Sequence, residues 1–280
     1  VVKNDDVVLG SHGRGFWILD DIGPLRQASP EKLSAPVTLF QPSNAIRGVY
    51  NAVFQYHLKQ PADSVVIDVL DEAGNLVRHF VGKQGQAKAA PSGDFWSRTE
   101  MKPTTAAGLN NFTWNLRYEG ATVFEGMILW GGSARIGPKA PIGNYQVRVT
   151  AAGHSETRPF KILMDPNLRG VTESDLKETF DIAIKIRDRE SAANEAVIRI
   201  REIRKQMELR LKETSDATIV ASAKEFLSKL AVVEEDLYQV RNQSWQDPLN
   251  FPIKLGNRLS ALRRSLETGE GKPTAGVYKV

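Results

Sequence analysis

Hydrophobic and polar residues alternate along the middle of the chain, in short runs separated by turns rich in glycine, asparagine and aspartate. Alternation with a period of two is typical of strands that bury one face. In the clearest run, one face carries Phe112, Trp114 and Leu116. Short alternating strands of this kind predict an immunoglobulin-like or fibronectin-like β-sandwich over residues 41–165.

The hydrophobic period changes to a helical one near residue 166. Apolar residues recur at spacings of three and four from Leu176 to Leu211, which predicts a helix about 60 Å long. Thr172-x-x-Asp175 resembles a capping box at its start, with Asp in place of the usual Glu or Gln. Further apolar stripes cover residues 219–240 and 255–266. Because such stripes should not stay wet, we expect an antiparallel helical bundle over residues 166–280.

Two shorter features concern the ends of the chain. Two short apolar runs, residues 7–10 and 15–20, flank a glycine-rich turn and predict a β-hairpin. A lone hairpin is only marginally stable in water, so this one needs further strands. The first residue is Val1 instead of Met, so we expect an internal or processed fragment. A Gly/Pro-rich break near the end predicts that the bundle is truncated before a further helix.

Composition excludes several classes of function. The chain has no cysteine, which rules out disulfides, thiolate metal sites and a cysteine nucleophile. A net charge of +4 is too small to indicate nucleic acid, and both signs are interleaved along the long helical stripe. None of the four histidines lies at metal-ligand spacing from another. We therefore expect no cofactor, no metal, no nucleic acid and no membrane span.

The segment VVLGSHGRGFWILDDIGPLR, residues 7–26, closely resembles the last propeller blade of bacterial proteins described as sortilin-like or BNR-repeat glycosyl hydrolases. In that family the propeller precedes an Ig-like domain and a helical tail, and the same order is expected here. AGLNNFTWNLR (residues 107–117) and APIGNYQVRV (140–149) resemble the Ig-like module. Residues 180–206 and 246–262 resemble the helical tail.

The resemblance implies a multidomain β plus α fold. It would comprise the closing strands of a β-propeller (residues 1–40), an immunoglobulin-like β-sandwich (41–165) and a C-terminal antiparallel helical bundle (166–280). It also implies export to the periplasm or the cell exterior. The expected partner is the upstream propeller of the same protein or a partner subunit.

The opening motif GSHGRGFWILDD can be interpreted as chemistry or as structure. As chemistry, His12 could act as a base and Asp20 or Asp21 as an acid, or the glycines could cradle a phosphate. However, the glycine spacing is not the dinucleotide fingerprint, and no helix follows. We favour the structural interpretation, in which glycines allow positive φ, Trp17 fills blade contacts and an aspartate caps the exit turn. The structural turn residues are then Gly10, His12, Gly13, Arg14, Gly15, Trp17, Asp20 and Asp21.

Two tryptophans are candidates for ligand binding. Trp96 and Trp130 lie in loop-like stretches, where flat aromatic faces could stack on a carbohydrate. Trp114 alternates with other apolar residues and is expected in the core.

Three functional hypotheses follow, and no catalytic residue is assigned within this chain. The leading one is a non-catalytic interaction or structural region of an exported propeller protein. A second places this region in a glycosidase or other hydrolase whose active site lies in the upstream propeller. A third is an assembly subunit that self-associates through the helical bundle.

Overall fold

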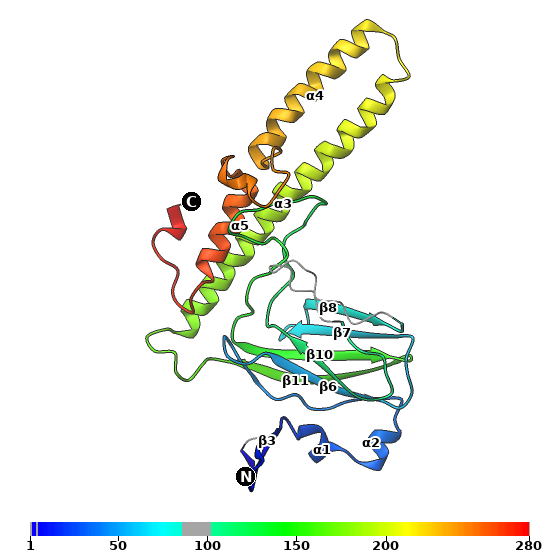
Figure 1. Cartoon of the computed structure of the whole chain (residues 1–280), viewed down its shortest axis with the longest axis vertical. Helices are drawn as coiled ribbons and strands as arrows, with labels where there is room; N and C mark the ends of the chain where they lie inside the picture. Colours follow the sequence, from blue (N-terminus) through cyan, green and yellow to red (C-terminus); the bar gives the residue numbers. More distant parts are fainter. Residues whose placement is uncertain (1, 4, 86–101, 280) are drawn as a thin grey trace. The chain divides into compact units, whose positions relative to one another are not determined.

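The structure, a computed structural model, describes residues 2–3, 5–85 and 102–279 (Figure 1). It is a mixed β plus α protein with two compact units. The first unit contains residues up to 116 together with 141–168, and the second contains residues 117–140 and those from 169 onward. Residues 117–140, which join two strands in sequence, thus belong with the helices. The predicted division at residues 40 and 165 had assigned this segment to the β-sandwich.

The first unit opens with the predicted hairpin. Strands β2 (Asp6–Ser11) and β3 (Gly15–Leu19) are antiparallel, and β1 (Val2–Lys3) pairs with the other edge of β2. Gly13 and Gly15 have φ values of 77° and 87°, which favour glycine in the connecting turn. Two short helices follow, α1 (Gly23–Gln27) and α2 (Pro30–Ser34), and both have proline in the first turn.

Two further sheets form the body of the first unit. The three-stranded sheet has the order β4-β6-β9, and the five-stranded sheet has the order β5-β11-β10-β7-β8. All pairs are antiparallel except β5 with β11. The strands are β4 (Val37–Leu39), β5 (Ala45–Ile46), β6 (Ala52–Leu58), β7 (Ser64–Asp71), β8 (Leu76–Lys83), β9 (Gly108–Trp114), β10 (Gly143–Ala151) and β11 (His154–Leu163).

Aromatic side chains fill the space between these two sheets. The ring of Phe54 on β6 lies 5.2 Å from that of Phe160 on β11, and Trp114 on β9 lies 6.0 Å from Tyr145 on β10. The alternation predicted from sequence is confirmed, because every second residue of β6 and β10 is buried. The two sheets therefore pack face to face through the residues that the alternation assigned to the core.

The second unit is built on three helices. They are α3 (Glu173–Leu211), α4 (Ala217–Leu237) and α5 (Leu255–Leu266), with 3-10 turns η1 (Asp247–Leu249) and η2 (Val277–Lys279). The predicted capping box is present, since Thr172 and Asp175 bond reciprocally to each other's backbone N–H. In Figure 1, α4 folds back along the C-terminal half of α3, and α5 lies beside the N-terminal half.

The prediction that no apolar stripe stays wet is wrong for α4. Ile219, Phe226 and Val233 are 54%, 45% and 49% exposed. The physical reason is the position of α5, which packs mainly against α3 and leaves the distal part of α4 with only α3 as a neighbour. Two helices cannot enclose each other's apolar stripes as four can.

We expect Trp114→Ala to lower the free energy of unfolding of the first unit by about 3–5 kcal/mol, because it opens a cavity between the sheets. Leu109→Ala is the matched control, since Leu109 is 53% exposed on the same strand. It should change stability by no more than about 0.5 kcal/mol. Denaturant unfolding followed by tryptophan and tyrosine fluorescence measures both. Equal losses in the two variants would contradict the assigned core.

Candidate functional site

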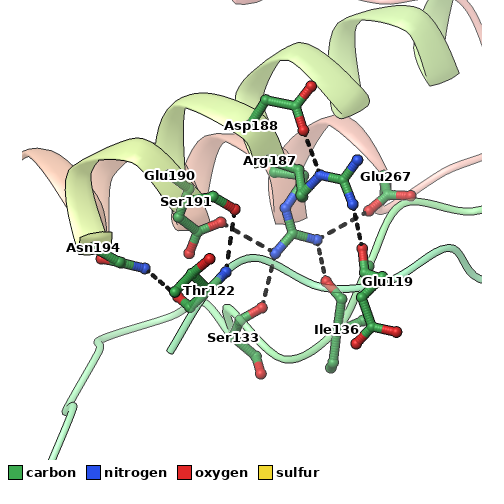
Figure 2. Close-up of polar contacts among 12 residues, drawn as sticks. Glu119, Thr122, Ser133, Ile136, Arg187, Asp188, Glu190, Ser191, Asn194 and Glu267 are labelled. Carbon is green, nitrogen blue, oxygen red and sulfur yellow. Dashed lines mark hydrogen bonds and ion pairs between the residues drawn. The ribbon is translucent and has the colours of Figure 1, made fainter. Parts of the chain in front are cut away.

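A group of polar side chains, most of them buried, lies in the second unit, where residues 117–140 contact α3 and α5 (Figure 2). We call it the arginine cluster, and it consists of Arg117, Glu190, Arg263 and Glu267. Glu190 on α3 is completely buried and Arg263 on α5 is 2% exposed. Buried charges are rare and costly unless they are paired, so this group has a defined task.

The guanidinium group of Arg263 connects three chain segments. Its Nη2 donates to the carbonyl oxygen of Ser133 at 2.8 Å, and its Nη1 donates to that of Ile136. The same group lies 3.4 Å from Glu190 Oε2 on α3 and 3.7 Å from Oε2 of Glu267, the residue that caps the C-terminus of α5. Arginine suits this position because its planar fork offers several donors in fixed directions.

Glu267 contacts residues at both ends of the 117–140 segment. It accepts a hydrogen bond from the Lys139 backbone N–H at 2.6 Å and lies 3.4 Å from Arg117 Nη1. The segment is also closed by its own backbone, since Tyr118 N–H donates to Pro138 O at 2.8 Å. The carboxylate thus holds a loop whose two ends already meet.

One face of α3 holds the first part of this segment. Ser191 Oγ accepts from Thr122 N–H at 3.1 Å, and Asn194 Nδ2 donates to Thr122 O at 2.7 Å (Figure 2). One turn earlier, Arg187 donates to Glu119 O at 2.9 Å. Positions three and four apart share a helix face, which explains why these three helical side chains reach neighbouring residues of the segment.

Side chains of α5 and the end of α4 hold the remainder. Asn257 makes two 2.7 Å hydrogen bonds to the backbone of Trp130, accepting from its N–H and donating to its carbonyl. Gly132 lies so close to Ser260 that a Cβ there would meet the hydroxyl oxygen at 2.4 Å. The hydroxyl of Tyr238 accepts from Ile128 N–H at 3.0 Å. Nearly all of these bonds recognise main-chain atoms of the segment.

The electrostatics of the cluster centre on Glu190. Burial raises the pKa of this carboxyl above its ordinary value of 4.5, and the nearby Arg263 charge and Ser260 hydroxyl act in the opposite direction. Burial has the larger effect because the ionised carboxylate has lost its water. Elsewhere in the unit, Glu234 is 2% exposed and is paired with Arg201 and Arg204 at 2.8 and 2.6 Å.

This arrangement anchors a chain segment. The two Nη groups of Arg263 that face residues 133–136 donate hydrogen bonds to backbone carbonyls of this segment. Across residues 2–3, 5–85 and 102–279, no three His, Asp or Glu side chains gather closely enough to hold a metal ion. The best-supported task of the cluster is to fix residues 117–140 on the helices.

The hydrophobic pattern did not predict this cluster, although one of its residues carries a local signal in the sequence. Glu190 occupies a position in the apolar stripe of α3, between Ile186 and Ala193, where a hydrophobic side chain is expected. Arg263 on α5 and Glu267, the C-cap residue of that helix, continue the buried face that includes Ser260. A charge at a core position of a predicted stripe is the signal that would have identified a buried ion pair.

The predicted turn residues lie together on the opening hairpin and its exit. Most are exposed to solvent: Gly10, His12, Gly13, Arg14, Gly15, Trp17 and Asp20. Asp21 is half-buried, and its Oδ1 accepts from the Gly23 N–H at the start of α1. The hydrogen bond from Asp21 N–H to Asp6 Oδ1 ties the exit of β3 to the start of β2. Their assignment to a propeller turn stays a prediction.

The two tryptophans predicted to contact carbohydrate have different outcomes. Trp96 lies outside the described residues. Trp130 is 49% exposed, and its backbone is fixed by Asn257. Carbohydrate binding at Trp130 stays a prediction.

Comparisons with known proteins identify no family. No protein-family model and no curated protein matches the chain. Among solved structures, the chain is similar to the crystal structure of CopC from Methylosinus trichosporium OB3b, with 15% sequence identity and a TM-score of 0.25. The match covers 47% of this chain and 98% of that one. A likeness at this TM-score carries no argument about fold or function.

In the part of the chain that the structure describes, none of the helices combines the length and the apolar character that crossing a bilayer requires.

We expect Arg263→Ala to lower the free energy of unfolding of the second unit by about 3–5 kcal/mol, because Glu190 then stays buried without its partner. Arg258→Ala is the control on the same helix, at an exposed position, and should cost no more than about 0.5 kcal/mol. Denaturant unfolding followed by far-UV circular dichroism measures the difference. Indistinguishable stabilities would show that Arg263 is not the anchor.

The raised pKa of Glu190 predicts a pH dependence that Glu190→Gln removes. Below pH 4.5 the carboxyl is protonated in both the folded and unfolded states. As the pH rises through the higher folded pKa, the unfolded state loses its proton first, and the stability contributed by Glu190 falls. The unfolding free energy of the unmodified chain minus that of Glu190→Gln should therefore decrease over this window. A difference that increases with pH, in urea titrations at several pH values, would mean that Arg263 outweighs burial.

Proposed function

We propose that this chain is the non-catalytic C-terminal interaction and structural region of an exported β-propeller protein. The observation that carries the proposal is the exposure of the opening hairpin. On β3, Phe16, Trp17 and Ile18 are 82%, 65% and 61% exposed. Because successive strand residues point to opposite faces, both faces of this strand carry apolar side chains that are exposed to solvent.

A strand pair that is apolar on both faces fits the interior of a larger β architecture. In a propeller, each four-stranded blade packs between two neighbouring blades, and its inner strands are covered on both faces. The order β1-β2-β3 leaves β3 at an edge, where further strands could pair with its backbone. The resemblance of residues 7–26 to a closing blade supports the same assignment.

The two packed sheets support the immunoglobulin-like part of the proposal. In the proposed module, β4, β6 and β9 would take the places of strands A, B and E of that fold, and β7, β10 and β11 those of C, F and G, which agrees with the observed strand orders. The parallel pairing of β5 with β11 is compatible with a first strand that switches sheets. In the proposed protein, this module is a spacer between the propeller and the helices.

The helical unit would supply the interaction surface. Its arginine cluster fixes residues 117–140, so that the apolar Trp130 is presented on a rigid backbone. The proposed partners are the propeller itself or a partner subunit. Export to the periplasm or the cell exterior belongs to the proposal through the family resemblance.

Hydrogen exchange tests the proposal on the opening hairpin. In the natural full-length protein, amides of β2 and β3 should be strongly protected, because the blade covers them. In the isolated 280-residue chain, they should exchange quickly, because a lone hairpin is marginally stable. Amides of β10, in the centre of its sheet, are the internal control and should be protected in both proteins.

Two outcomes would overturn the proposal. The first is a natural protein whose intact mass equals the 31.0 kDa of this chain, since no propeller could then precede it. The second is hydrolysis of glycosidic or peptide bonds by the isolated chain, which contradicts a non-catalytic role.

A further inference from the structure

An open groove of about 410 Å³ lies on the five-stranded sheet of the first unit, at the end of β11 and the start of β10. Here Asn144 lies opposite Lys161, and Gln146 lies opposite Pro159. These four side chains face away from the core of the sandwich, because the residues that alternate with them are buried. The volume lies in the range of small-molecule sites.

One wall of the groove is the segment that leads into β5. Gln41 Nε2 donates to the carbonyl oxygen of Pro159 at 2.5 Å, and Asn44 Oδ1 accepts from the backbone N–H of Lys161 at 3.0 Å. Each of the two amides thus keeps one polar end on β11. The other ends, Gln41 Oε1 and Asn44 Nδ2, have no hydrogen-bond partner among the described residues.

The other wall is the turn between β7 and β8. Glu72 Oε1 accepts from Asn144 Nδ2 at 3.0 Å, which leaves the second oxygen of each side chain available. Gln146 lies between the walls, and within residues 2–3, 5–85 and 102–279 its side chain makes no hydrogen bond. Its amide therefore offers both a donor and an acceptor.

The available groups indicate which ligand the groove suits. Acceptors and donors are present in similar number, and the first wall alone offers one of each. The acceptors come from Gln41, Asn144 and Glu72, the donors from Asn44 and Lys161, and both from Gln146. An anion would need mainly donors, and a cation mainly acceptors. A hydroxyl group both donates and accepts, so that a molecule with several hydroxyl groups matches this set.

Charge and apolar surface narrow the ligand further. Glu72 and Lys161 carry one charge of each sign, so the groove has no net charge that would select an ion. Pro159 is exposed on the floor, and its ring presents C–H groups between the two walls. Neighbouring strands are about 5 Å apart, which is comparable with the width of one sugar ring. A sugar combines an apolar ring face with hydroxyl groups around its edge.

We propose that this groove binds a neutral carbohydrate, with one sugar ring over Pro159 and its hydroxyl groups bonded to the amides of both walls. The hydrogen bonds of Gln41, Asn44 and Asn144 to the protein hold these amides in place before the ligand arrives, which lowers the entropic cost of binding. The site lies within the first unit and does not depend on the propeller assignment.

Nuclear magnetic resonance tests the proposal through the side-chain amides themselves. The 280-residue chain, labelled with the NMR-active nitrogen isotope, gives N–H signals for each Asn and Gln side chain. The probes are the methyl glycosides of glucose, galactose, mannose and N-acetylglucosamine. At least one of them should shift the signals of Asn44, Asn144 and Gln146, with a dissociation constant in the millimolar range. Added salt should leave this constant unchanged, because the ligand carries no charge.

Two matched variants locate the bound sugar. Gln146→Ala removes a donor and an acceptor from the groove, and should raise the dissociation constant about tenfold. Gln55→Ala is the control, because Gln55 is also a half-buried glutamine in the middle of a strand, on β6 of the other sheet. It should leave the dissociation constant unchanged. Both variants should keep the backbone spectrum of the unmodified chain, since neither side chain has a hydrogen bond among the described residues.

Three outcomes would overturn the proposal. The first is that none of the four glycosides shifts the signals of the groove. The second is that glycine or sodium phosphate shifts these signals and the glycosides do not, which would assign a zwitterion or an anion to the groove. The third is an equal loss of binding in Gln146→Ala and Gln55→Ala, which would place the sugar elsewhere. Each of these outcomes leaves the hydrogen-exchange test of the hairpin unaffected.

Discussion

The guanidinium group of Arg263 is the contact on which the second unit depends. It joins α5, α3 and the 117–140 segment at one point, and each of its partners is another residue of the second unit. Without it, Glu190 would be a buried charge on a helix that otherwise presents an apolar stripe to its neighbours. An ion pair of this type adds little net stability compared with a hydrophobic pair, because desolvation is costly. Its two hydrogen bonds to the carbonyls of Ser133 and Ile136 favour this placement of the segment, because a displaced segment would leave the buried guanidinium without these acceptors.

The fixed segment and the exposed apolar residues of α4 divide the second unit into two parts with different properties. Near the arginine cluster, three chain segments contact one another, and hydrogen bonds join the 117–140 segment to the helical side chains. Toward the tip of the α3–α4 hairpin, two helices contact only each other and apolar side chains stay exposed to solvent. Stability therefore decreases along the hairpin from the cluster toward the tip, in keeping with local differences in apolar burial.

Much of the fold could be predicted from the period of the hydrophobic pattern. The strands around Phe112 and Tyr145, the capping box at Thr172 and the three long helices lie where the sequence placed them. Short elements such as α1 and β5 were not foreseen, because segments this short carry too few residues to show a period. The assignment of residues 117–140 to the helices depends on long-range hydrogen bonds, which leave no local pattern. Within the candidate site, Arg263 leaves no local pattern either, because an arginine that bonds to distant carbonyls looks like any other helical arginine. Glu190 does leave a local signal, since it is a charge inside the apolar stripe of α3.

The helices hold the 117–140 segment through its main chain, as the bonds to Thr122, Trp130, Ser133 and Ile136 show. Backbone atoms are common to all residues, so the exposed side chains of the segment, Glu125, Trp130 and Arg135 among them, can change over evolutionary time without loosening the anchor. Other positions are constrained, including Arg117, whose side chain pairs with Glu267, and Gly120, Gly132 and Gly137, where an added Cβ would collide with neighbouring atoms. The segment thus resembles a display loop, in which helical residues fix the frame and the outward side chains can be exchanged for new binding specificities.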